Sequence, residues 1–141
     1  MAASPIRTRA CDSHQAKQRM ERAREFLTVA ELVVDEKDED ASFVYASSAA
    51  ALAVMAGIAA SDAACCAVLQ ERSRSRNHRD AERLLAQITP GGKGAADDLR
   101  ELLNLKDKAQ YGFPKMSVPE VRKVMRRARR LFDFAAEANR R

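Results

Sequence analysis

The sequence predicts an all-α fold, an antiparallel bundle of four long helices and one short helix. Gly and Pro number only 5 and 4 among 141 residues, and aromatic residues make up 5% with no Trp, which is sparse for an all-β chain. The stretch 43–69 is rich in Ala and holds a single charge, as expected of a buried central helix. On both sides of it, apolar residues recur every three or four positions, which is the helical period.

The first helix is expected over residues 13–37. Asp12 or Ser13 can cap it, and an apolar stripe on one side of the helix lies opposite a row of Arg, Lys and Glu on the other side. Residues 1–12 lack periodicity and are expected to be a flexible lead-in to a single domain, 13–141.

The remaining helices follow with short connections. An acidic turn at 35–42 precedes the central helix, which is expected to end near Arg72, and a short third helix is expected over 78–89. A fourth helix is expected over 94–111 and a last one over 117–139. Pro and Gly punctuate the two boundaries between these last three helices, and a capping-box pattern opens the last one.

Three cysteines, Cys11, Cys65 and Cys66, are too few for a disulfide framework and lack metal-binding spacing. We expect small buried thiols, no metal or cofactor, no signal segment, and a reducing cytoplasm. The central stretch is long enough to span a membrane, but a carboxylate such as Asp62 inside a span costs about 2.5–3.5 kcal/mol. A core helix is therefore expected, and no membrane association.

Two charges interrupt otherwise apolar helix faces. Asp62 is the only charge in the central helix, and Lys106 stands where the fourth helix calls for an apolar residue. Because a buried charge needs a partner, we expect the two to meet, with Asp62 facing the fourth helix, or one of them to reach a cleft. Such a pair either fixes helix register or forms a site with tuned pKa values.

His78 and Tyr111 are further candidates for chemistry. His78 begins the third helix, where an exposed or capping role competes with a catalytic one, and Arg72 precedes it at a spacing seen in one ribonuclease signature. Tyr111 ends the stretch LLNLKDKAQYG, in which polar side chains share one helical stripe. The stripe is either a solvated face or the edge of a site around Lys106. No P-loop, HExxH or nucleophile elbow is present.

The net charge of +5 and the pI near 9.4 come with a strongly basic last helix. This basic helix is either a solvated, salt-bridged face or a contact surface for RNA or a partner. The candidate RNA- or partner-binding residues are Lys108, Arg122, Arg126, Arg127 and Arg130.

The helix order, together with the motifs AGIAASDAACC, HRDAERLL and LLNLKDKAQYG, resembles HEPN domains, particularly small stand-alone bacterial ones, over residues 15–138. The resemblance implies a homodimer. Many such domains are metal-independent ribonucleases in which an Arg and a His act on the RNA 2′-hydroxyl. Toxin members paired with nucleotidyltransferase antitoxins add a Tyr. These positions correspond here to Asn104, Ala109 and Tyr111, so both catalytic residues are replaced.

The leading hypothesis is therefore a catalytically degenerate HEPN-like binding or regulatory protein that engages RNA or a partner such as a nucleotidyltransferase. The second is a metal-independent ribonuclease toxin of a toxin–antitoxin system, with Lys106, Tyr111, Asp62 and His78 as its altered site. The third is a purely structural homodimer.

Overall fold

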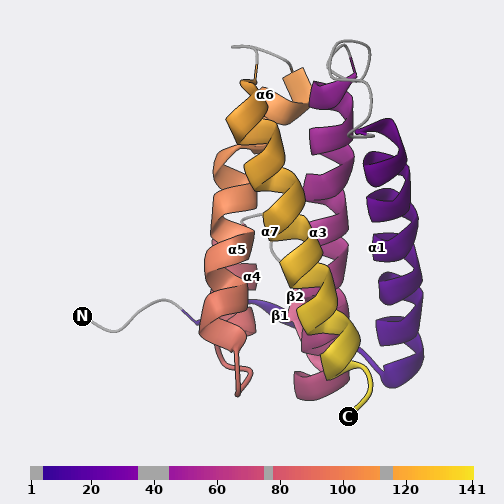
Figure 1. The fold of residues 1–141 in the computed structure, drawn as a ribbon. Coiled ribbons are helices and arrows are strands. Elements are labelled where there is room, and N and C mark those ends of the chain that lie inside the picture. Colours follow the sequence, from indigo (N-terminus) through magenta and orange to yellow (C-terminus); the bar gives the residue numbers. More distant parts are fainter. Residues whose placement is uncertain (1–4, 35–44, 75–77, 112–115) are drawn as a thin grey trace.

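The computed structural model describes residues 5–34, 45–74, 78–111 and 116–141, and it confirms an all-α helical bundle (Figure 1). Four helices run alongside one another, and two shorter helices and two short strands complete the described part of the chain. The long helices are α1 (Ser13–Val33), α3 (Ala46–Leu69), α5 (Gly92–Asn104) and α7 (Val118–Ala138). The short elements are β1 (Thr8–Ala10), β2 (Glu71–Ser73), α4 (His78–Leu85) and α6 (Lys106–Tyr111).

The starts of α1 and α7 are both capped as expected, and of the two candidates for the first cap the structure uses Asp12. The Asp12 carboxylate accepts a hydrogen bond from the backbone N–H of Gln15, and the Gln15 side chain accepts one from the Asp12 backbone. Ser117 and Glu120 form the same reciprocal pair at the start of α7. These local bonds fix where α1 and α7 begin. The acidic turn predicted at 35–42 lies outside the described residues.

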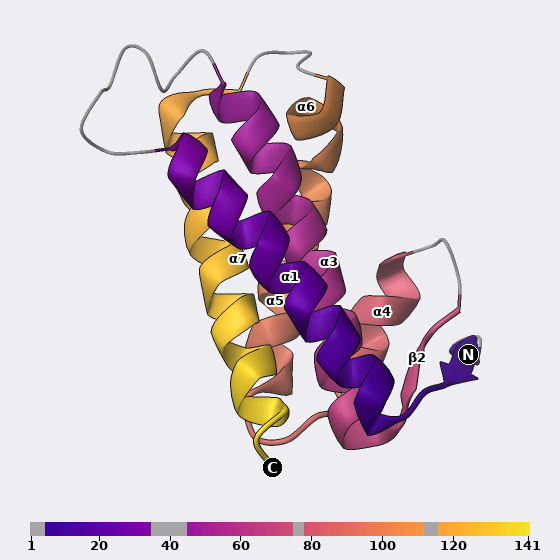
Figure 2. The ribbon, with the colours of Figure 1, turned by 90° about the vertical axis from the view of Figure 1, so that its right-hand side faces the viewer.

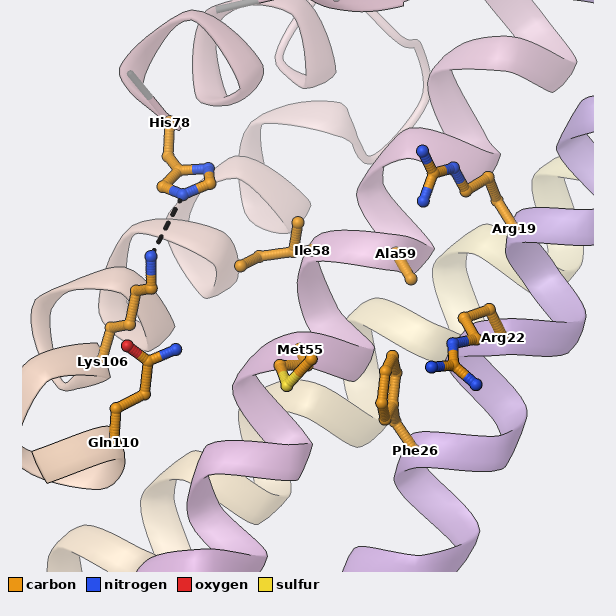
Figure 3. Close-up of a pocket in the computed structure, with 9 residues that line it drawn as sticks. All are labelled: Arg19, Arg22, Phe26, Met55, Ile58, Ala59, His78, Lys106 and Gln110. Carbon is orange, nitrogen blue, oxygen red and sulfur yellow. Dashed lines mark hydrogen bonds between the residues drawn. The ribbon is translucent and has the colours of Figure 1, made fainter. Parts of the chain in front are cut away.

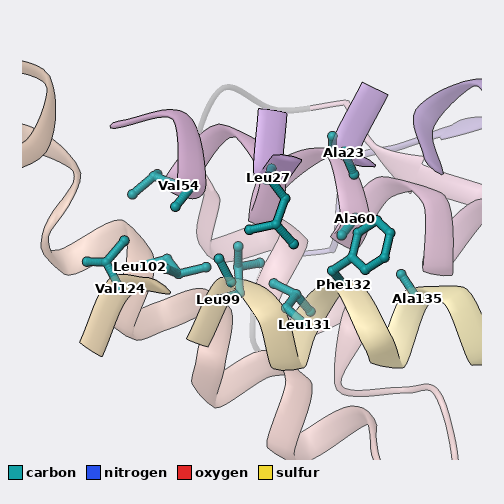
Figure 4. Packing of buried hydrophobic residues seen from close by; sticks show 14 of the residues in the cluster. Ala23, Leu27, Val54, Ala60, Leu99, Leu102, Val124, Leu131, Phe132 and Ala135 are labelled. Atoms are coloured by element: carbon teal, nitrogen blue, oxygen red, sulfur yellow. The ribbon is translucent and has the colours of Figure 1, made fainter. Parts of the chain in front are cut away.

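Helix α3 is the centre of the bundle, as predicted, and it contacts α1, α7, α5, α6 and α4. Ala occupies most of its buried positions, so large side chains from the surrounding helices fill the core. Figure 4 shows Leu27 of α1, Leu99 of α5 and Leu131 of α7 meeting in this core. By length and composition α3 could cross a membrane, yet 61% of its most apolar window is buried inside the bundle.

The N-terminal segment differs from the flexible lead-in that was expected. β1 pairs antiparallel with β2, with Arg9 opposite Arg72. The pairing arises because α3 ends at Leu69 rather than near Arg72: Gln70 adopts a left-handed conformation with φ of 59°, which turns the chain away from the helix axis. Three-residue strands carry no periodic signal that the sequence alone could reveal.

The expectation that all three cysteines are free thiols is wrong for two of them. Cys11, just before α1, forms a disulfide with Cys66 of α3. Cys65 is free and buried, and burial raises its pKa to about 12. Adjacent residues on a helix point about 100° apart, so only one of the two neighbours can face Cys11. A bridge between residues 55 positions apart leaves no spacing signature.

The predicted fourth helix is two helices. α5 ends at Asn104, and the Leu105 backbone N–H bonds to the carbonyl of Leu102, closing a tight last turn. α6 then begins at Lys106. Lys106 therefore does not continue the apolar face of α5, and this break decides where its side chain points. α4 also ends earlier than predicted, at Leu85 rather than at 89.

Candidate functional site

The structure does not pair Asp62 with Lys106. The carboxylate of Asp62 lies 4.0 Å from Nε of Arg19 on α1, and the Asp62 side chain is 17% exposed. Burial raises the pKa of this carboxyl group, and the positive charges of Arg19 and Arg72 oppose that rise. The expectation that Asp62 faces the fourth helix is wrong, because position 62 of α3 turns toward α1 and β2 while Lys106 belongs to a separate helix.

The alternative expectation, that one of these charges reaches a cleft, is confirmed for Lys106. It lines a pocket of about 420 Å³ between α1, α3, α4 and α6 (Figure 3). The view in Figure 2 shows these four helices around the same side of the bundle. The lining residues are Arg19, Arg22, Phe26, Met55, Ile58, Ala59, His78, Lys106 and Gln110.

His78 and Lys106 form one wall of the pocket. His78 is the first residue of α4, and Lys106 is the first residue of α6. Nζ of Lys106 lies 3.4 Å from Nε2 of His78 (Figure 3). Burial, and then the charge of Lys106, lowers the pKa of the His78 imidazole. A neutral imidazole accepts a hydrogen bond from the ammonium group. Among the described residues no carboxylate is hydrogen-bonded to either side chain, so the positive charge of Lys106 is available to a ligand.

The opposite wall is formed by α1. Arg22 is paired with Glu25 at 2.9 Å, and its guanidinium lies 4.4 Å from the centre of the Phe26 ring. Arg19 stands one turn earlier and is held only at the 4.0 Å limit of its contact with Asp62. Cations therefore face the pocket from two sides.

The floor between these walls is apolar. Met55, Ile58 and Ala59 lie on one stripe of α3, and Met55 is 39% exposed (Figure 3). Met55 is exposed and Ile58 is half-buried, so the other described helices leave part of this stripe uncovered, while Ala59 is buried at its base. An anion that also carries an apolar or planar group would satisfy both the walls and the floor.

Tyr111 does not take part in this pocket. Its side chain is 76% exposed, and it is absent from the lining. Of the positions that correspond to the HEPN catalytic pair, Ala109 is buried and Asn104 is exposed. The structure thus brings together His78 and Lys106 of the four catalytic candidates, and it leaves Asp62 and Tyr111 apart from them.

The pocket residues on α1 and α3 escaped the sequence analysis. Phe26 falls on the apolar stripe expected of the first helix, and Arg19 and Arg22 are not distinguished in the sequence from the other residues of its charged face. Met55 is one of few large side chains in the Ala-rich run, which is the one signal that could have marked it. Nothing in the sequence relates these positions to Lys106.

Four of the six Lys and Arg residues of the basic helix α7 form ion pairs in the described structure. Arg127 and Arg130 both pair with the buried carboxylate of Asp98 on α5, and Lys108 of α6 pairs with Glu120 at 2.9 Å. Over the described ranges, Arg122 and Arg126 are exposed and have no ion pair. Much of the predicted RNA-binding surface is therefore a salt-bridged helix face.

In the part of the chain that the structure describes, no group of three or more His, Cys, Asp or Glu side chains could hold a metal ion. No protein-family model and no curated protein matches the chain. The fold defines the chain as an all-α helical bundle with a cationic, apolar-floored pocket.

Proposed function

We propose that this chain is a HEPN-like, non-catalytic RNA-binding module whose pocket holds one unpaired nucleotide of a single-stranded RNA. The observation that carries the proposal is the chemistry of the pocket, in which cations on two walls flank an apolar floor. Phosphate oxygens would lie against Lys106 and Arg22, and the base would lie over Met55. Proteins recognise single-stranded RNA by this combination of phosphate contacts and base stacking on apolar or aromatic surfaces.

The volume of the pocket and the net charge of the protein agree with this role. A volume of about 420 Å³ falls in the range of small-ligand sites and suits one nucleotide rather than a duplex. The net charge of +5 favours the approach of a polyanion. The pocket is preferred to α7 as the contact surface because it combines Lys106, which has no carboxylate partner among the described residues, with an apolar floor, whereas Arg127 and Arg130 share the carboxylate of Asp98.

Neutralising variants of the pocket test the proposal. A short fluorescent single-stranded RNA should bind with an affinity that falls steeply with salt. Lys106→Gln or Arg22→Gln should each weaken binding about tenfold, the loss of about 1.4 kcal/mol of charge-assisted contact. Each should also reduce the slope of log K against log salt by about 0.7, the value for one phosphate contact on a single strand. Met55→Ser should weaken binding without changing that slope.

Arg122→Gln and Arg126→Gln on α7 are the matched controls, since both residues are exposed and free of ion pairs within the described chain. Neither residue lines the pocket, so these variants should leave the affinity within about twofold, as screened surface charges outside a binding site do. A loss of binding in these variants, with none in the pocket variants, would transfer the RNA site to α7. Absence of RNA binding by the parent protein would refute the proposal.

A metal-independent ribonuclease is the second candidate, and the contact between His78 and Lys106 favours it. A His with a lowered pKa is neutral near pH 7 and can accept the proton of a 2′-hydroxyl, while the ammonium group stabilises phosphate charge. Tyr111 has no part in this version. RNA cleavage in the presence of a chelator, lost in His78→Gln, would support an enzyme. If the RNA stays intact after prolonged incubation, the ribonuclease hypothesis is refuted and the non-catalytic binding module is the remaining hypothesis.

The family resemblance also predicts a homodimer and a nucleotidyltransferase-type partner, and the cysteine usage and the N-terminal sequence predict a cytoplasmic location; all three remain predictions. Sedimentation of the purified chain tests the homodimer. Co-purification with a co-expressed nucleotidyltransferase tests the partner.

A further inference from the structure

We propose that the Cys11–Cys66 disulfide is a redox switch that sets the geometry of the pocket through β1 and β2. The inference concerns regulation of the proposed RNA site. Its structural part, however, can be tested without RNA. The observation behind it is that the disulfide holds residues 7–11, which we call the strap, against α3 and β2.

Apart from the disulfide, hydrogen bonds hold the strap, and the only one from a side chain among the described residues runs from the Thr8 hydroxyl to the Glu71 carboxylate at 3.1 Å. Backbone bonds join it to the segment after α3: the Cys11 N–H donates to the Gln70 carbonyl at 3.0 Å, and the Arg74 N–H donates to the Arg7 carbonyl at 2.9 Å. The two strands have three residues each, and an isolated two-stranded sheet is marginally stable in water. The covalent bond to Cys66 therefore supplies much of the restraint that keeps β1 in place.

Two connections lead from β2 to the pocket. The first is electrostatic: Arg72 of β2 acts on Asp62, and Asp62 holds Arg19, which lines the pocket. The second is a packing contact: β2 lies against α4, whose first residue is His78. Movement of β2 would thus change one residue on each wall.

Reduction should weaken RNA binding. A dithiol reductant attacks the S–S bond and forms a mixed disulfide, which a second thiolate of the reductant resolves. The two cysteines gain two electrons and two protons, and the reductant leaves as its own disulfide. With the strap released, Arg72 no longer shares Asp62, so Asp62 holds Arg19 more tightly and withdraws it from the ligand. The α4 end that carries His78 also loses its support.

The predicted cytoplasmic location is consistent with a reversible disulfide. Disulfides inside a reducing cytoplasm are usually transient and are used for catalysis or redox sensing. Cys11 is 7% exposed and Cys66 only 1%. Exchange with a small dithiol therefore has to begin with a local opening of the strap, and a marginal strand pair provides one.

The experiment compares the oxidised and dithiol-reduced full chain by amide hydrogen exchange, by the imidazole NMR signals of His78 and by RNA affinity. Reduction should speed exchange about tenfold in β1 and β2 while the core of α3 stays protected, shift the His78 signals, and weaken RNA binding several-fold. Cys66→Ala should reproduce the reduced state under oxidising conditions. Cys65→Ala, the adjacent buried cysteine without a bridge, should respond to oxidation and reduction as the parent does.

Unchanged His78 signals after complete reduction would overturn the proposal. Faster exchange spread evenly over all helices would also overturn it, because it would indicate global destabilisation rather than a local switch. If RNA binds in neither redox state, the proposed function fails, while hydrogen exchange and the His78 signals still decide for or against the switch.

Discussion

Replacing Gly57 by Ala should destabilise the protein, although Ala is the better helix former. Gly57 lies at the middle of α3, where an added Cβ would overlap Cδ1 of Leu102 and stand 3.5 Å from Cδ2 of Leu131. Leu102 is fully buried, so its side chain has to repack against the surrounding core residues to admit the methyl group. The glycine therefore permits the close approach of α5 to the central helix.

Two opposing terms set the magnitude. Gly→Ala within a helix gains about 1 kcal/mol from propensity. Forcing a methyl group into a packed core costs about 1–3 kcal/mol. With a mid-range overpacking cost of about 2 kcal/mol, Gly57→Ala should lower the free energy of unfolding by about 1 kcal/mol. The corresponding fall in Tm for a chain of this length is about 4 °C.

Urea unfolding followed by far-ultraviolet circular dichroism measures the change. Gly94→Ala in α5 is the matched control, because a Cβ there meets nothing within 4 Å, and it should raise the free energy of unfolding by about 0.5–1 kcal/mol. In Gly57→Ala/Leu102→Ala the new methyl group should fill part of the cavity, so that the double variant loses less than the sum of the single variants. If Gly57→Ala stabilises the chain as Gly94→Ala does, the described packing of α5 on α3 is wrong.

Two further predictions concern single charges. Asp98→Asn should lower the free energy of unfolding by about 2 kcal/mol in urea titrations, less than for a fully buried pair because Arg127 and Arg130 are partly exposed. Asp97→Asn next to it should cost less than about 0.5 kcal/mol, since its pair with Arg100 is solvent-exposed. Equal effects would contradict this difference. Because the pKa of His78 is lowered in the folded state, the unfolded chain binds more protons just below pH 6.5, so stability should be lost as the pH falls through that range. His78→Gln should reduce this pH dependence in a series of urea midpoints, and an unchanged slope would contradict the assigned environment.

Some parts of the candidate site could be anticipated from the sequence. Lys106 was singled out because it breaks an apolar pattern, and it does reach the pocket. His78 stands out in the sequence because the chain has only two histidines. The sequence could not predict that these two side chains meet, because they are 28 residues apart. They meet because α5 ends at Asn104 and the separate helix α6 directs Lys106 toward α4. The sequence marks Asp62 as unusual but predicts Lys106 as its partner, whereas the structure places Arg19 beside it.

The sequence by itself determined the features that depend on neighbours along the chain. The helical period, the Ala-rich central helix, a cap at Asp12 or Ser13 and the capping box at Ser117 act within a few residues, so composition and spacing reveal them. Only the tertiary structure decided the contacts between distant segments: the Cys11–Cys66 bridge, the β1–β2 pairing and the pocket that Lys106 shares with α1. These depend on how helix faces rotate and where helices break, and both result from packing of the whole core rather than from any local pattern.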